Sequence, residues 1–155
     1  MNIIFLDIDG VLNTSHFALK DYKNKYGGYL IIDREKVKIL KQICDLTNAS
    51  VVLSTGWKYI LDEDLKALDD NGKFLLEIFK ENEIPLIGKT KTIPKDLGDG
   101  RILQYWKEYE IIDYLERHKE VKHFCIIDDE EKGLESLLDY LIKTKDYQAY
   151  EKDEG

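Results

Sequence analysis

Four short apolar runs, each followed by polar or charged residues, constrain the fold of this chain more than any other feature. They are NIIFLD at 2–7, SVVLS at 50–54, IPLIG at 84–88 and HFCIID at 123–128, and YLIKT at 140–144 has the character of a short fifth run. Runs of this length are typical of strands that are buried on both faces of a parallel sheet.

Helical periodicity fills the intervals between these runs. Apolar residues recur at helical spacing over residues 37–44, behind Asp33, which is a favoured N-cap residue. A second pattern over residues 65–79 predicts one or two helices with a break near Asn71–Gly72, and a third pattern lies at 111–115. Strands that alternate with helices predict an α/β fold, with a parallel sheet, right-handed crossovers and helices on both faces.

Length and composition indicate one domain. A chain of 155 residues, 43% hydrophobic and 35% charged, has the size of a single unit, which we expect over residues 1–144. Residues 145–155 are polar and are expected to form a fraying C-terminal tail. No stretch approaches the roughly 18 apolar residues of a membrane span. Cys44 and Cys125 lie in apolar runs, as buried thiols do, so we expect a cytoplasmic protein with no membrane partner.

The charge balance disfavours one class of function. The chain has 23 basic and 31 acidic residues, a net charge of −8, which repels polyanions at long range. We therefore expect no strong general binding to nucleic acid. Two basic groups offer local exceptions, and solvated loops are the alternative interpretation of both: Lys20, Lys23 and Lys25, and then Lys89, Lys91 and Lys95.

The residues at which the apolar runs stop carry the chemical signal, because ligands of open parallel sheets bind outside the carboxyl ends of the strands. These ends read Asp7-Ile8-Asp9-Gly10, Ser54-Thr55-Gly56 and Asp128-Asp129. Four carboxylates at one edge repel one another, so they must share a cation or take up protons. An all-oxygen site suits Mg²⁺ better than zinc, because no cysteine or histidine pair stands at ligand spacing.

The motifs at these ends resemble those of the haloacid dehalogenase (HAD) phosphohydrolases. IIFLDIDGVLN is similar to their first motif, VVLSTG to the second and FCIIDD to the fourth. The third motif is a Lys or Arg near the start of a helix, a place that Lys107 fits, with Arg101 and Lys89 as competitors. The resemblance covers residues 3–129. Within the superfamily, the pattern is similar to the small bacterial family grouped with Swiss-army-knife RNA-repair proteins and, more distantly, to the phosphatase half of polynucleotide kinase-phosphatases.

This resemblance implies a three-layer Rossmann-like fold and a magnesium-dependent phosphomonoester hydrolase that acts through an aspartyl-phosphate. Asp7 would be the nucleophile, and Asp9 would protonate the leaving group and then deprotonate the attacking water. Thr55 would hydrogen-bond the phosphoryl group, with Ser54 as the alternative hydroxyl. Lys107 would stabilise the charge of the phosphoryl group and of Asp7.

The same resemblance implies a metal site and substrate contacts. The expected metal ligands are Asp7, Asp9 through its backbone carbonyl, Asp128 and Asp129. The expected substrate contacts are Ser54, Gly56, Trp57 and Lys58, with packing as an equal alternative for Trp57.

HAD enzymes that act on small metabolites usually carry a cap domain, for which this chain has no room. A cap of typically 50 residues fits neither between Asn13 and Asp33 nor in residues 57–83. An open site suits a phosphate on a large substrate such as a nucleic-acid end. Residues 14–30 would form the only local lid, and its contacts would be Lys20, Lys23, Tyr22 and Tyr26.

Three other functions remain as alternatives. They are a nucleotide or small-metabolite phosphatase, a HAD-like binding module without activity, and a signalling receiver domain. Receivers place their acidic pair first and their lysine last, whereas here the DxD motif comes first and the DD pair follows the lysine. The sequence does not indicate the oligomeric state.

Overall fold

The chain forms a five-stranded parallel sheet. The computed structural model describes residues 1–13, 23–93, 95–96, 102–103 and 107–145, with backbone alone for residues 95–96 and 102–103. The strand order is β3-β2-β1-β6-β7. The bounds are β1 Asn2–Leu6, β2 Ala49–Leu53, β3 Leu86–Lys89, β6 His123–Asp128 and β7 Leu141–Lys143. All five expected strands are confirmed, with ends shifted by no more than two residues.

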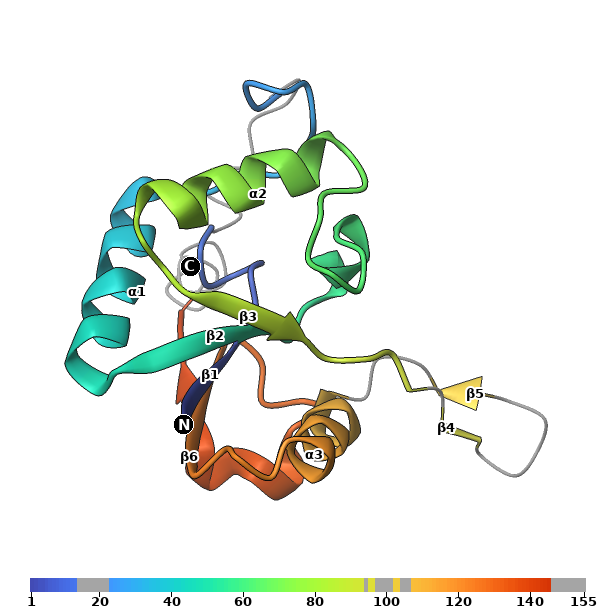
Figure 1. The fold of residues 1–155 in the computed structure, drawn as a ribbon. Coiled ribbons are helices and arrows are strands. Elements are labelled where there is room, and N and C mark those ends of the chain that lie inside the picture. Colours follow the sequence, from blue (N-terminus) through green and yellow to red (C-terminus); the bar gives the residue numbers. More distant parts are fainter. Residues whose placement is uncertain (14–22, 94, 97–101, 104–106, 146–155) are drawn as a thin grey trace, which may run out of the picture.

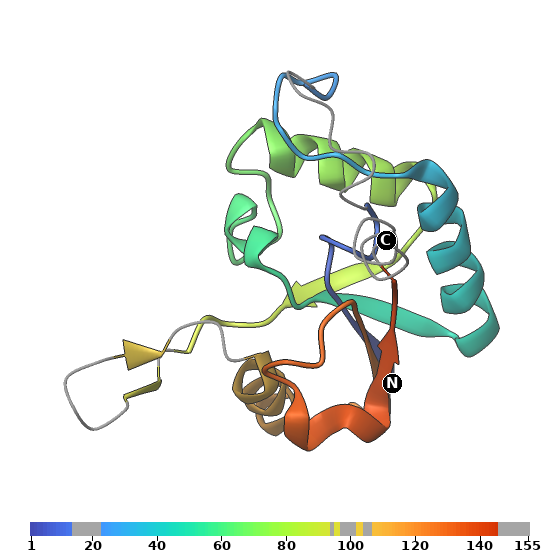
Figure 2. The same cartoon turned by 180° about the vertical axis from the view of Figure 1, so that it is seen from behind.

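Helical elements cover both faces of the sheet (Figures 1 and 2). Helices α1 (Arg34–Thr47) and α2 (Asp70–Glu81) lie on one face, while α3 (Lys107–Arg117) and the 3₁₀ segment η3 (Glu135–Tyr140) lie on the other. Alternate side chains of the central strand enter the two cores, with Ile4 and Leu6 on the α1–α2 side. Ile3 and Phe5 lie on the α3–η3 side. The predicted three-layer α/β fold is confirmed.

The predicted start of α1 is confirmed. The side chain of Asp33 accepts a hydrogen bond from the Glu35 backbone N–H at 3.0 Å, which satisfies a donor that the helix leaves unpaired. The helix ends at Asn48, which adopts the left-handed conformation that terminates helices (φ 53°).

The predicted helix over residues 65–79 is wrong in its first part. Helix α2 begins only at Asp70, behind the N-cap Asp69. Leu65 has a positive φ of 61°, and the Asp62 carboxylate accepts hydrogen bonds from the backbone N–H groups of Asp64 and Lys66. An aspartate that binds nearby backbone donors in this way competes with a helix. Asn71 and Gly72, where a break was expected, instead lie in the first turn of α2.

Several small elements escaped prediction, among them η3, because they offer too few residues to form a pattern. A 3₁₀ segment, η2 (Gly56–Ile60), follows β2. Strands β4 (Lys95–Asp96) and β5 (Ile102–Leu103) form an antiparallel pair that projects away from the main sheet (Figure 1). The described ranges contain no cap domain. None of the helices in those ranges is long and apolar enough to cross a membrane.

Candidate active site

The register of the three central strands aligns the ends of the first, second and fourth apolar runs. Leu6 of β1 pairs with Leu53 of β2 and with Ile127 of β6, and all three side chains face the α1–α2 core. The ladder continues for one more residue, because the Ser54 N–H donates to Leu6 O at 2.8 Å and the Asp7 N–H to Ile127 O at 3.0 Å. Strand alternation therefore places the next three side chains on the α3 side of the carboxyl edge: Asp7, Ser54 and Asp128.

Lys107, the first residue of α3, reaches this edge. Its Nζ atom lies 3.0 Å from Asp7 Oδ2 and 2.6 Å from Asp128 Oδ2. The competing Lys89 instead donates to the backbone carbonyls of Lys58 at 3.1 Å and Leu61 at 2.7 Å. Arg101, the other competitor, lies outside the described residues. The structure thus brings Lys107, and not Lys89, to the paired carboxylates.

A third carboxylate completes an acidic group. Oxygen atoms of Asp7, Asp128 and Asp129 all lie within 4.8 Å of one another. Gly10 leaves the room that Asp129 occupies, because a Cβ atom at position 10 would lie 2.2 Å from Asp129 Oδ2. Gly10 also has a φ of 81°, which side chains disfavour. The glycine of the DxDG motif is therefore required by both its backbone conformation and its neighbour.

The charges of this group are not balanced. Burial raises the pKa of Asp7 to about 6, against the attraction of Lys107 and with a contribution from the negative charge of Asp128. Burial also raises the pKa of Asp129 to about 7, assisted by its hydrogen bond to Asp128 and by the charges of Asp7 and Asp128. Burial opposes the charge of Lys107, but the two carboxylates outweigh it and raise its pKa. Two of the three carboxylates thus contact one ammonium, that of Lys107.

The residues at this edge fit a magnesium ion. The three carboxylates supply hard oxygen ligands, and a divalent cation would favour the ionised forms of Asp7 and Asp129, which burial and neighbouring negative charge disfavour. The side chain of Asp9 does not belong to this group. It is exposed, whereas Asp7 and Asp128 are buried.

Two side chains hold the carboxylate of Asp9. Trp57 Nε1 donates to Asp9 Oδ2 at 2.9 Å, and Asn13 Nδ2 donates to Asp9 Oδ1 at 3.2 Å. Asn13 is itself fixed, since it also donates to Ile31 O and accepts from the Gly10 N–H. Sequence reasoning assigned no role to Asn13. Its place four residues after Asp9, in a turn, was the available signal.

The two candidate hydroxyls differ in their contacts. Thr55 is the N-cap of η2, and its Oγ1 atom accepts from the Trp57 backbone N–H at 3.2 Å. Ser54 is 1% exposed, and its hydroxyl has no hydrogen-bond partner. Gly56 follows at the surface, with open space where a Cβ would lie. Both hydroxyls therefore stay candidates for a phosphoryl contact.

Lys58 does not reach the open edge. Its ammonium is buried and lies 2.6 Å from the Glu110 carboxylate, so we leave it out of the proposed substrate contacts. In the expected lid, Lys20 and Tyr22 lie outside the described residues. Lys23 lies over the ring of Tyr29, with Nζ 4.4 Å from its centroid.

The parallel sheet and the acidic group at its carboxyl edge are the arrangement expected of a HAD domain. A comparison with protein-family models matches residues 3–153 to the HAD domain in Swiss Army Knife RNA repair proteins, and the chain belongs to this family. No curated protein matches the chain closely enough to serve as a relative. Membership places the chain among the HAD-type phosphatases in general, a class that acts on phosphorylated substrates and generally uses Mg²⁺.

Proposed function

We propose that the chain is a magnesium-dependent phosphomonoester hydrolase that acts through an aspartyl-phosphate at Asp7. The arrangement of one ammonium between two carboxylates carries this proposal: Lys107 contacts Asp7 and Asp128 at the carboxyl edge of the sheet. Phosphoryl transfer needs an in-line nucleophile, charge neutralisation and an acid for the leaving group, and this edge offers residues for all three.

In the first step, a carboxylate oxygen of Asp7 attacks phosphorus while the bond from phosphorus to the leaving oxygen breaks. Asp9 gives its proton to that oxygen. In the second step, water attacks phosphorus, Asp9 takes up the proton of the water, and the bond between phosphorus and the Asp7 oxygen breaks. Trp57 and Asn13 support this role, because their hydrogen bonds fix the orientation of the Asp9 carboxyl.

Hydrogen-bond donors of the protein stabilise the negative charge on the transferring phosphoryl group. Lys107 interacts with the phosphoryl oxygens and keeps Asp7 ionised. Thr55 donates its hydroxyl proton to a phosphoryl oxygen, because its lone pair already accepts from the Trp57 N–H. Ser54 is the alternative donor, since its hydroxyl is buried without a partner. The two assignments predict different sensitivities to mutation.

Asp7, Asp128 and Asp129 would hold the magnesium ion, together with the backbone carbonyl of Asp9. When bound, Mg²⁺ stabilises negative charge on the phosphoryl oxygens. The carboxylate oxygens of the three side chains are close enough to share one cation.

The proposed substrate is an accessible phosphate on a large molecule, such as a nucleic-acid end. The absence of a cap from the described ranges and the name of the matched family both support this class. The net charge of −8 favours weak, salt-dependent binding through a few lysines. For about one to four contacts to a single strand, the log–log salt slope is expected to be roughly −1 to −3.

Phosphate release tests the proposal directly. We expect hydrolysis of p-nitrophenyl phosphate in Mg²⁺, loss of activity in excess chelator, and inhibition by Ca²⁺, whose looser shell disturbs in-line geometry. Full activity in chelator would contradict the metal site. A 3′-phosphorylated oligonucleotide is expected to exceed a nucleoside monophosphate and a phosphopeptide in kcat/KM. Preference for the nucleotide would contradict the open site.

A further inference from the structure

A second charged pair lies behind the acidic group and is almost completely buried. Lys58 is 6% exposed and Glu110 is 3% exposed, and their Nζ and Oε2 atoms lie 2.6 Å apart. The same ammonium donates to Thr90 Oγ1 at 3.3 Å. The three residues belong to η2, to α3 and to the position after β3. One ammonium thus joins three segments that meet at the carboxyl edge.

The pair connects the two segments that carry the proposed reaction chemistry. Glu110 lies three residues after Lys107 in α3, a spacing that places both side chains on one face of the helix. Lys58 directly follows Trp57, whose indole holds Asp9. The ion pair therefore ties the helix that presents Lys107 to the segment that orients Asp9.

Attachment of α3 to the sheet does not explain this pair. Ile111 and Tyr114 already bury one side of the helix in the core. Glu108 accepts hydrogen bonds from the backbone and hydroxyl of Ser136 at 2.9 and 2.7 Å. A buried ion pair is a poor source of stability, because desolvation offsets much of the attraction and apolar replacements are often as stable. The pair instead fixes the orientation of the first turn of α3 relative to η2.

We propose that the Lys58–Glu110 pair is a positioning device for the hydrolysis. It fixes the position of the first turn of α3 relative to η2, so that Lys107 and Asp9 can act on the same phosphoryl group. Neither side chain contacts the substrate. The kinetic part of this inference rests on the proposed function, because it requires phosphatase activity. A misplacement of about 1 Å in a reacting group can cost about a hundredfold in rate.

The test is the double variant Lys58→Met/Glu110→Met, which removes both charges, keeps most of the volume and leaves no buried charge unpaired. The matched control is Asp113→Asn/Arg117→Gln, which removes a half-exposed 2.9 Å ion pair near the end of the same helix. Urea denaturation reports folding, and kcat and KM are measured with p-nitrophenyl phosphate. We expect the double variant to fold and to lose about ten- to a hundredfold in kcat, with KM within about threefold. The control should match the wild type.

A wild-type kcat in the folded double variant would overturn the inference and leave the phosphatase proposal standing. If the double variant does not fold, Thr90→Val replaces it, since this change removes one partner of the Lys58 ammonium and introduces no charge. We then expect a loss of about threefold or more in kcat at unchanged KM. An unchanged kcat in that variant would also overturn the inference.

A wild-type protein without phosphatase activity would refute the proposed function alone. The positioning role then has a structural readout in a crystal structure of the double variant. We expect Lys107 Nζ to leave hydrogen-bond distance of Asp128 Oδ2. Retention of the 2.6 Å contact would contradict the positioning role.

Discussion

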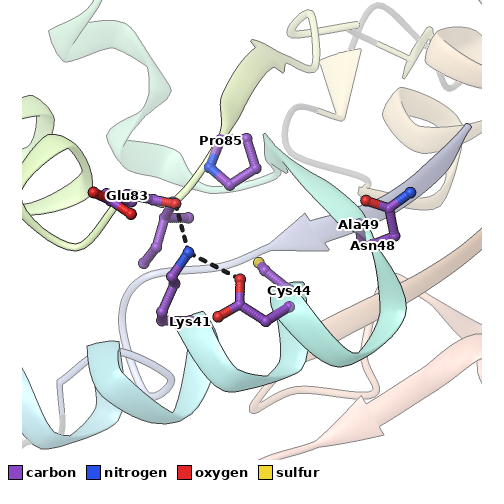
Figure 3. A pocket seen from close by; sticks show the side chains of 8 residues that line it. Lys41, Cys44, Asn48, Ala49, Glu83 and Pro85 are labelled. Carbon is purple, nitrogen blue, oxygen red and sulfur yellow. Dashed lines mark hydrogen bonds and ion pairs between the residues drawn. The ribbon is translucent and has the colours of Figure 1, made fainter.

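The two ends of the sheet both gather charged side chains, but they handle the charge differently. At the amino end, a hollow of about 340 Å³ is lined by α1 and by the segment before β3 (Figure 3). Lys41 there lies 2.9 Å from Asp45, one turn along the same helix, and donates to Glu83 O at 3.0 Å. At the carboxyl end, Lys107 contacts two carboxylates of a group of three.

This difference separates a hollow from a candidate active site. The hollow at the amino end is lined by Lys41 and by two acidic residues, Asp45 and Glu83, of which Asp45 pairs with the Lys41 ammonium. Burial raises the pKa of the neighbouring Cys44 thiol, which keeps it unreactive at neutral pH. At the carboxyl end, burial and mutual repulsion disfavour the ionised forms of Asp7 and Asp129, and a divalent cation would compensate that cost. Buried charge without local compensation therefore marks the site better than the volume of a cavity does.

The largest expected effect is on catalysis at the carboxyl end. Asp7→Asn removes the nucleophile with almost no change in volume, so we expect a loss of at least about a thousandfold in kcat with the fold intact. The matched change at the amino end, Asp45→Asn, should leave kcat unchanged. Phosphate release and circular dichroism check both variants. An Asp7→Asn protein with more than about a tenth of wild-type activity would disprove the assignment.

Replacing the lysine at each end of the sheet should again show that the two ends differ. Lys107→Met leaves two buried carboxylates unpaired and the phosphoryl charge unmet, so we expect kcat to fall about a hundredfold or more. The free energy of unfolding should fall by about 1–3 kcal/mol at neutral pH. Lys41→Met breaks a partly exposed pair and should change stability by less than about 1 kcal/mol, with kcat unaffected. Equal effects of the two variants would remove the distinction between the ends.

A smaller effect distinguishes the two hydroxyls at the carboxyl end. If Thr55 donates to the phosphoryl group, Thr55→Val should lower kcat about tenfold or more, whereas Ser54→Ala should change it by less than about threefold. The opposite ranking would assign this contact to Ser54. Parallel measurement of KM and unfolding free energy shows whether a lost N-cap of η2 contributes.

The smallest effect is a pH dependence of stability without magnesium. The folded pKa of Asp129 is raised from 3.8 to about 7, so the folded state binds its proton more tightly than the unfolded chain. This stabilisation is present at low pH and is lost as the pH rises toward 7. Relative to wild type, the unfolding free energy of Asp129→Asn should rise by about 1–2 kcal/mol from pH 5 to pH 8, less than the roughly 2.7 kcal/mol of two full pKa units because Asp129 is only partly buried. Asp45→Asn should show no such gain, and a flat Asp129→Asn difference would contradict the raised pKa.

The sequence predicted those parts of the molecule that depend on local pattern. The apolar runs identified the five strands of the main sheet, and the helical pattern before β6 placed Lys107 near the start of a helix. Contacts between distant residues were not predictable in this way. Lys58 and Glu110 are 52 residues apart, so nothing near Lys58 in the sequence indicated that its ammonium would be buried. The turn at Asp62 likewise replaced an expected helix through hydrogen bonds that apolar periodicity does not reveal.

The central claim is that Asp7 at the carboxyl end accepts the phosphoryl group. Mass spectrometry of acid-quenched reactions with p-nitrophenyl phosphate tests it most directly, in wild type and in Asp9→Asn, where deprotonation of the attacking water is impaired. The account predicts that the peptide containing Asp7 gains the mass of one phosphoryl group, that this adduct accumulates in Asp9→Asn, and that the peptide containing Asp45 stays unmodified. Phosphate release with no phosphoryl group on Asp7 at any quench time would contradict the account.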